Sequence, residues 1–227
     1  MTLSLRPLVA IAGALALSGS VSAPALAPSL PVAAAVLPVT QSAMPGQALR
    51  PLLRLIAKHE SGKHGLNAAN RGRAGDTPGG SVQAVGQQLI HLTVAEVMAH
   101  QRAGRLYAVG AYQLIPRTLA WAVAEIGLDT SRKFDQHAQE ELMVALLRRK
   151  RPEVWDFLTA NGCLDQALLA MAKEWASIGV PFAAGRASRR GISYYAGTGN
   201  NRASISPDAV ASALQEARAG KLLRKFS

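Results

Sequence analysis

Apolar residues recur along this chain at the spacing of an α-helix, and this pattern restricts the possible folds more than any other feature. Leu49, Leu52, Leu53 and Ile56 stand at i, i+3, i+4 and i+7, which is one face of a helix. The same spacing returns in later segments that begin at Val94, Leu119, Ala138, Leu164 and Val210. Hydrophobic residues make up 49% of the sequence, which is enough for a sizeable core. The pattern predicts a mostly helical domain.

Several of these helices also carry end signals. Thr93-Val94-Ala95-Glu96 has the form of a capping box, and Gly127 is a typical helix end. Pro152 predicts the start of a short helix that ends near Asn161-Gly162. Ser206-Pro207-Asp208 combines an N-cap, a proline at the first helical position and an early acid, so it predicts a last helix.

The helical pattern is interrupted between residues 61 and 92. Gly, Asn, Asp and Pro dominate from Asn67 to Gly80, and we expect residues 82–92 to hold a small hairpin. So long an irregular segment in a compact helical domain is commonly functional. The predicted fold class is therefore α+β and mostly α, with a small irregular or β-hairpin subdomain.

The N-terminus has the pattern of a secretory signal. One positive charge, at Arg6, precedes an apolar run at residues 7–17, and Val21-Ser22-Ala23 is a cleavage-like triplet. We expect a signal peptide at residues 1–23, an uncharged Ala/Pro-rich linker at 24–47 and the folded domain at 48–227. An uncleaved anchor or an Ala-rich arm is the alternative. The mature protein is predicted to be periplasmic or secreted.

The net charge of +11 indicates an anionic partner. Export favours cell-wall polymers over nucleic acid, and we expect Arg148-Arg149-Lys150-Arg151 to form a solvated helix end with non-specific attraction to such polymers. A single Cys excludes an intrachain disulfide framework and a Cys₂ or Cys₄ zinc site. His59 and His64 match a metal-binding helix poorly, so neither a metal nor a cofactor is expected.

Glu60 is the candidate for a catalytic acid. All 14 acidic residues lie between Glu60 and Glu216, so Glu60 is the first acid of the chain. It extends the apolar face of Leu49 and Ile56 and stands at the start of the irregular segment. Burial in such a place raises the pKa of a carboxyl group and keeps it protonated, as a general acid requires. The alternative is a glutamate at a helix end that points into solvent.

The order of three short motifs resembles the lysozyme-like lytic transglycosylases. The motifs are Glu60-Ser61-Gly62, Gly110-Ala111-Tyr112-Gln113, and residues 195–200. The segment from Val109 to Ser177 is most similar to the phage lambda endolysin type, with Trp175-Ala176-Ser177 about sixty residues after the Tyr-Gln pair. The resemblance covers residues 48–218. It implies a lysozyme-like fold and one catalytic Glu that cleaves peptidoglycan between N-acetylmuramic acid and N-acetylglucosamine.

The resemblance also implies substrate-binding residues. Tyr112 and Gln113 match the segment that lines the cleft opposite the acid, and Tyr194, Tyr195 and Asn200 match a second segment near the sugar. The family has Asn after its Tyr, whereas Ala196 follows Tyr195, so which Tyr faces the cleft is open. Asp76 is the candidate for a second carboxylate, and its surroundings also read as a plain turn.

The predicted function is cleavage of peptidoglycan glycan strands by a monomer, with Glu60 as acid and then base and with 1,6-anhydro products. One alternative is lysozyme-type hydrolysis of the same bond, which needs a second carboxylate. Another is a catalytically silent factor that binds the cell wall or assists assembly. A basic nucleic-acid binder is a third alternative, and it would show steeply salt-dependent affinity for DNA.

Overall fold

The computed structural model describes residues 46–72, 77–198 and 201–223. The predicted signal peptide, almost all of the linker, Asp76 and Asn200 lie outside the described residues. The described chain is mostly helical and has a small two-stranded antiparallel sheet, which confirms the predicted α+β, mostly α class. Among these residues, no helix combines the length and the apolar character that crossing a membrane requires.

The elements follow one another with short connections in the first three quarters of the domain. They fall into two groups along the chain. The first is α1 (Gly46–Ser61), the 3₁₀ helix η1 (Gly62–Asn67), β1 (Ala69–Asn70), α2 (Gly80–Val85), the 3₁₀ helix η3 (Leu89–His91), α3 (Val94–Arg102) and β2 (Ala108–Val109). The second is α4 (Pro116–Ile126), α5 (Gln136–Ala145), the π-helical turn η4 (Leu146–Lys150), α6 (Pro152–Thr159), α7 (Leu164–Glu174) and α8 (Pro207–Leu223).

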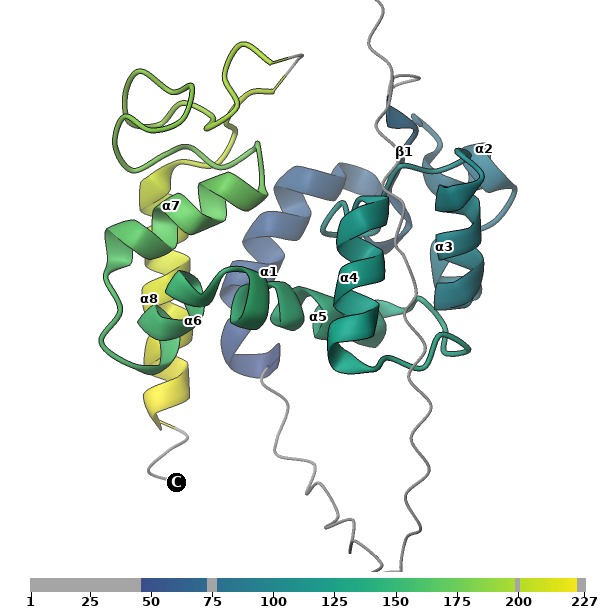
Figure 1. Ribbon diagram of the computed structural model, residues 1–227, viewed down its shortest axis with the longest axis horizontal. Helices are drawn as coiled ribbons and strands as arrows, with labels where there is room; N and C mark the ends of the chain where they lie inside the picture. Colours follow the sequence, from purple (N-terminus) through teal and green to yellow (C-terminus); the bar gives the residue numbers. More distant parts are fainter. Residues whose placement is uncertain (1–45, 73–76, 199–200, 224–227) are drawn as a thin grey trace, which may run out of the picture. The chain divides into compact units, whose positions relative to one another are not determined.

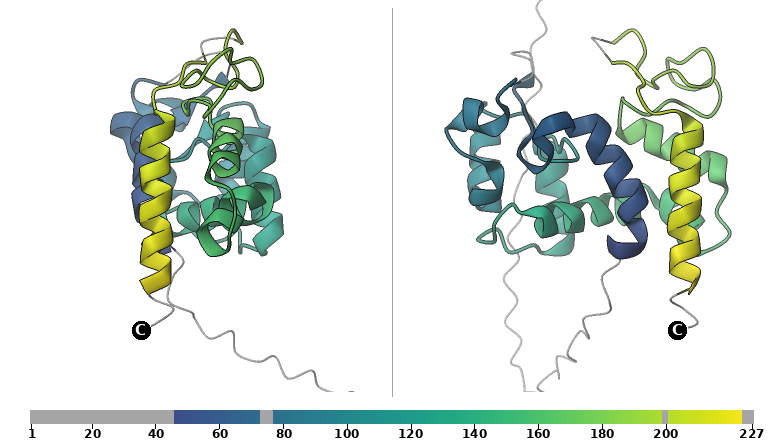
Figure 2. Two further views of the ribbon diagram at one scale, coloured as in Figure 1. Left: turned by 90° about the vertical axis from the view of Figure 1, so that its left-hand side faces the viewer. Right: turned by 180° about the vertical axis from the view of Figure 1, so that it is seen from behind.

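Helix α1 lies at the centre of the domain. Figure 1 shows it between α6, α7 and α8 on one side and α2, α3 and α4 on the other. Helix α8 packs along α1, as the rear view in Figure 2 also shows. The predicted apolar face is confirmed, because Leu49, Leu52, Leu53 and Ile56 are at most 2% exposed. Because this face is buried among the neighbouring helices, the last turn of α1 is held in a fixed position.

Most of the predicted helix ends are confirmed. The Thr93 hydroxyl accepts the N–H of Glu96, and the Glu96 carboxylate accepts the N–H of Thr93. Gly127 ends α4 in the left-handed conformation that glycine adopts without strain. Pro152 opens α6, and the Ser206 hydroxyl accepts the N–H of Ala209 at the start of α8.

The hairpin expected at residues 82–92 is wrong. This stretch forms α2 and η3 instead, because Gly86 ends α2 with φ 82° and the Ser81 hydroxyl accepts the N–H of Leu89 at 3.2 Å. The backbone groups are thus satisfied without a partner strand. The two strands are distant in sequence: Ala69 of β1 pairs with Val109 of β2, and Asn70 pairs with Ala108.

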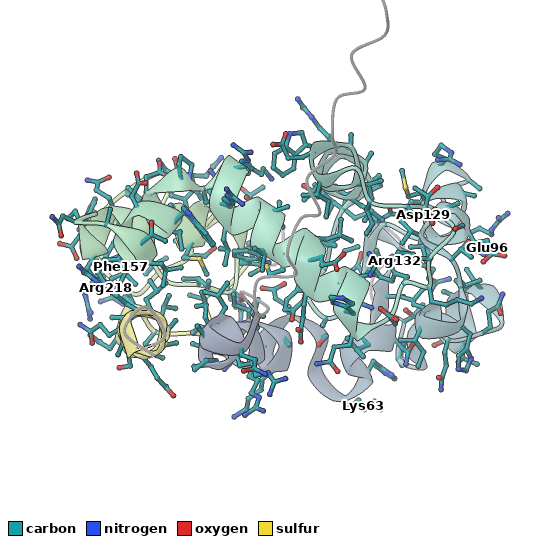
Figure 3. All side chains as sticks on the ribbon, turned by 90° about the horizontal axis from the view of Figure 1, so that it is seen from below. Lys63, Glu96, Asp129, Arg132, Phe157 and Arg218 are labelled. Atoms are coloured by element: carbon teal, nitrogen blue, oxygen red, sulfur yellow. The ribbon has the colours of Figure 1, made fainter. Side chains whose placement is uncertain are left out.

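The segment between α7 and α8 folds over the ends of these two helices (Figure 1). Isolated bridges join Ile178 to Ile205 and Gly179 to Ser193 within it. Lower on α8, the guanidinium group of Arg218 lies 4.9 Å from the ring centre of Phe157 on α6, and Figure 3 labels both side chains. This contact joins α8 to α6, while α8 also packs along α1.

Candidate active site

Glu60 stands in the last turn of α1, where the buried face of the helix reaches a hollow in the surface. Its side chain is half-buried, directly above the fully buried Ile56. Burial raises the pKa of the Glu60 carboxyl, and a hydrogen bond from Ser177 partly offsets that rise. The predicted position on the apolar face is therefore where the structure places this acid.

Ser177 is the residue that contacts Glu60 most directly, and it comes from the segment after α7. Its hydroxyl donates to Oε1 of Glu60. The carbonyl oxygen of Ser177 accepts the N–H groups of Ser204 at 2.7 Å and Ile205 at 2.9 Å, so the backbone at this serine is anchored. The sequence alone did not predict a role for Ser177, although this serine belongs to the Trp175-Ala176-Ser177 triplet that carries part of the family resemblance.

Two adjoining cavities share Glu60 and Gln113. The first has a volume of about 230 Å³ and also contacts Lys150, Arg151, Lys173 and Glu174; we call it the basic cavity. The second has a volume of about 410 Å³ and is lined by η1, Ala68, Ala69, Thr77 and Pro78; we call it the η1 cavity. Glu60 thus stands at the junction of a cleft that continues on both sides of it.

Gln113 occupies this junction in a strained conformation. Its φ is 51°, and it is the one residue other than glycine with positive φ among those described. Such a backbone costs free energy and is retained where its surroundings enforce it. The Gln113 amide donates to the carbonyl of Gly110 at 3.0 Å, which keeps the side chain at the cleft. Gln113, which the sequence predicts to bind substrate, therefore lines both cavities together with Glu60.

A buried glutamine holds the turn that carries Gln113. Gln139 of α5 is fully buried, and its Oε1 accepts the N–H of Ala111 at 2.8 Å. Its amide nitrogen donates to the carbonyl oxygens of Leu66 at 3.1 Å and Phe134 at 3.0 Å. One side chain thus ties η1, the start of α5 and the Gly110–Gln113 turn together.

The side chain of Tyr112 lies in the core. It is 4% exposed, and burial, reinforced by the nearby Glu140 carboxylate, raises the pKa of its phenol. Its carbonyl accepts the indole N–H of Trp175 at 3.1 Å. Tyr112 therefore borders the basic cavity while supporting the turn from behind, and it does not offer an open ring face.

The two adjacent tyrosines have different positions. Tyr195 lines the basic cavity, and its hydroxyl donates to the carbonyl of Lys173 at 2.6 Å. Burial raises the pKa of Tyr195. The ring of Tyr194 packs against Gly185, where a Cβ would come within 2.6 Å of it, and meets Tyr195 edge-on at 5.2 Å. Tyr195 is thus the cleft residue of the pair.

Lys150 and Arg151 correct the prediction of a wholly solvated basic run. Both contact Glu174, whose side chain is 8% exposed. Arg148 and Arg149 remain at the surface: Arg148 lies over Trp155, and Arg149 pairs with Glu125. Lys150 is the last residue of the π-helical turn η4, and Arg151 follows it, so the run divides between a surface pair and a pair that contacts α7.

Of the two histidines near Glu60 in the sequence, His64 lines the η1 cavity. Asp76 and Asn200 lie outside the described residues. His59 is exposed, and its Nδ1 lies 3.2 Å from the Ser204 hydroxyl. No group of three or more His, Cys, Asp or Glu side chains suited to a metal is present in residues 46–72, 77–198 and 201–223.

Comparisons with family models, with curated proteins and with solved structures find no match to this chain. A carboxyl group with a raised pKa, oriented by a serine at the centre of an open cleft, can donate a proton to a bound extended ligand.

Proposed function

We propose that this protein is an exported peptidoglycan-cleaving enzyme of the lysozyme-like lytic transglycosylase type. Its substrate is the β-1,4 bond between N-acetylmuramic acid and N-acetylglucosamine. The observation that carries the proposal is the position of Glu60: a half-buried carboxyl with a raised pKa at the junction of two cavities. The same conclusion is supported by the order of the three motifs, by the predicted signal peptide at residues 1–23 and by the net charge of +11.

The reaction needs one carboxyl group. Protonated Glu60 donates its proton to the glycosidic oxygen as the bond from that oxygen to C1 of the muramic residue breaks. The Glu60 carboxylate then accepts the proton of the C6 hydroxyl of the same residue, and the C6 oxygen bonds to C1. The products are a free 4-hydroxyl and a 1,6-anhydro sugar. Glu60 ends the cycle protonated, and no water is consumed.

The described lining of the cleft favours this lyase over a hydrolase. A hydrolase of the two-carboxylate design needs a second carboxylate at a set distance from the acid. Among the described residues that line the two cavities, the one other carboxylate is Glu174, which two cations already engage. Asp76 lies outside the described residues and remains the candidate through which hydrolysis would proceed.

The test is release of soluble muropeptides from purified sacculi. We expect the wild-type protein to release them and Glu60→Gln to release at least about a hundredfold less, since general acid catalysis is worth about 10²–10⁴-fold. Equal activity of Glu60→Gln would contradict the assignment. No release by a folded wild-type protein would instead favour the silent wall-binding factor.

Mass spectrometry of the products separates the two reactions. An anhydro product is lighter by one water than the hydrolysis product. A product population that is fully hydrolysed would replace the lyase mechanism with the lysozyme alternative and would direct attention to Asp76. Exclusively anhydro products would agree with the single-carboxyl mechanism.

A further inference from the structure

We infer that the basic cavity binds a carboxylate group of the substrate, with Lys150 as its principal donor. The inference rests on the proposed function, because it names the feature of the glycan strand that this end of the cleft recognises. Substrate recognition would then be electrostatic at one side of Glu60, in addition to whatever contacts the sugar rings make.

The charge balance of the basic cavity is the first observation. Lys150, Arg151 and Lys173 line it, against the carboxylates of Glu174 and Glu60. Glu60 has a raised pKa and counts as neutral in the acid-competent enzyme. The remaining groups leave an excess of positive charge in a partly enclosed space, where the attraction for an anion is stronger than at an open surface.

The second observation is that Glu174 holds two cations in place. Nζ of Lys150 donates to Oε1 at 2.7 Å, and Nε of Arg151 donates to Oε2 at 2.9 Å. The side chains of Lys150 and Arg151 are 35% and 21% exposed, so both keep a path to the cavity. One cation would suffice to neutralise the buried carboxylate. Two cations on one carboxylate therefore leave a net positive charge beside Glu174.

The donors of Lys150 support the same inference. An ammonium group has three N–H donors. Glu174 takes one and the Thr118 hydroxyl, at 3.3 Å, takes another. Within the described part of the chain no protein group accepts the third. Arg151 donates to Glu174 through Nε and to the carbonyl of Lys173 at 3.1 Å through Nη2, and its side chain is less exposed than that of Lys150. Lys150 is thus the more exposed of the two cations, and it has a donor to spare beside the cavity.

Two kinds of carboxylate on a peptidoglycan strand could meet this donor. A muramic residue without a peptide carries a free lactyl carboxylate close to the sugar ring. A muramic residue with a peptide carries its carboxylates further out, on the stem. The shared chemistry is a carboxylate near the cleavage site, and matched substrates separate the two sources.

The experiment measures binding by the Glu60→Gln protein, so that a failure of cleavage and a failure of carboxylate recognition are read separately. Three strands of equal length are compared at one ionic strength: peptide-bearing strands, strands stripped of peptide, and stripped strands whose lactyl carboxylates have been converted to neutral amides. We expect at least one of the two carboxylate-bearing strands to bind about tenfold or more tighter than the amidated one, the low end for a charge-assisted hydrogen bond. The tighter of those two identifies the source.

Variants of neighbouring lysine and arginine residues test the role of Lys150. Lys150→Met should remove this preference, and Lys150→Arg should retain most of it. Arg149→Met is the matched control: it removes one positive charge from the same turn, but this side chain is 58% exposed and pairs with Glu125 outside the cavity. Equal binding of all three strands by the Lys150-containing protein, or equal effects of Lys150→Met and Arg149→Met, would overturn the inference.

Discussion

Gln139→Met tests whether one buried amide holds the cleft together. Methionine has nearly the same length and flexibility as glutamine, so the change removes hydrogen bonds while largely conserving volume. The side chain of Gln139 is fully buried and contacts the backbone of three segments. The substitution leaves the N–H of Ala111 and the carbonyl oxygens of Leu66 and Phe134 without this partner.

The expected loss of stability follows from these three groups. A buried polar group that loses its partner costs about 1–3 kcal/mol, and relaxation or an entering water recovers part of it, so we expect about 3–5 kcal/mol in total. This is a large fraction of the roughly 5–15 kcal/mol that stabilises a typical domain. The protein should remain folded in water but unfold much earlier in denaturant.

Urea denaturation followed by far-UV circular dichroism measures this loss. With a slope of about 2 kcal/mol per molar urea, the midpoint should fall by about 1.5–2.5 M. Gln136→Met is the control on the same helix: this residue is exposed and donates to Glu140 at 2.7 Å, so its midpoint should change by less than about 0.3 M. Similar midpoints for the two variants would refute the structural role of Gln139.

The other predictions concern the groups at the junction of the cleft. Because the folded pKa of Glu60 is raised, wild-type folding is favoured below the unfolded pKa and loses that contribution as pH rises through the folded pKa. Glu60→Gln should therefore unfold at a higher temperature than wild type at pH 7, with a smaller advantage at pH 4; an offset that does not depend on pH would contradict the assignment. Ser177→Ala removes the hydrogen bond that lowers the Glu60 pKa, so the alkaline limb of the rate profile should move to higher pH while kcat falls several-fold. Gln113→Gly relieves the positive φ of 51° and should keep or raise the denaturation midpoint while lowering activity at least about tenfold, and unchanged activity would exclude a role for this side chain.

The sequence predicts those parts of the structure that depend on neighbouring residues. The apolar face of α1, the Thr93 capping box and the glycine end of α4 each arise from positions within one or two turns. The place of Glu60 follows from the same periodicity, because a residue that extends a buried face is carried to its edge. These features need no knowledge of how distant segments meet.

The contacts that define the site depend on segments far apart in the chain. Ser177 reaches Glu60 from 117 positions away, and the bridge between Ile178 and Ile205 helps to set its position. The sequence predicts a solvated helix end at Lys150 and Arg151, whereas both cations contact Glu174, which lies more than twenty positions away. The strand pairing of β1 with β2 likewise joins residues about forty positions apart.

Features that oppose folding are concentrated around this one cleft. Glu60 is half-buried with a raised pKa, Gln113 has a left-handed backbone, and Glu174 is buried with two cations. Each costs stability, and each lies on the lining of the basic cavity. A scaffold that merely held its neighbours would gain stability by replacing these groups with apolar or unstrained ones. Their common location therefore favours chemistry at Glu60, independently of any resemblance to a family. If single replacements of Glu60, Gln113 and Glu174 each stabilised the protein without loss of activity, this reasoning would be refuted.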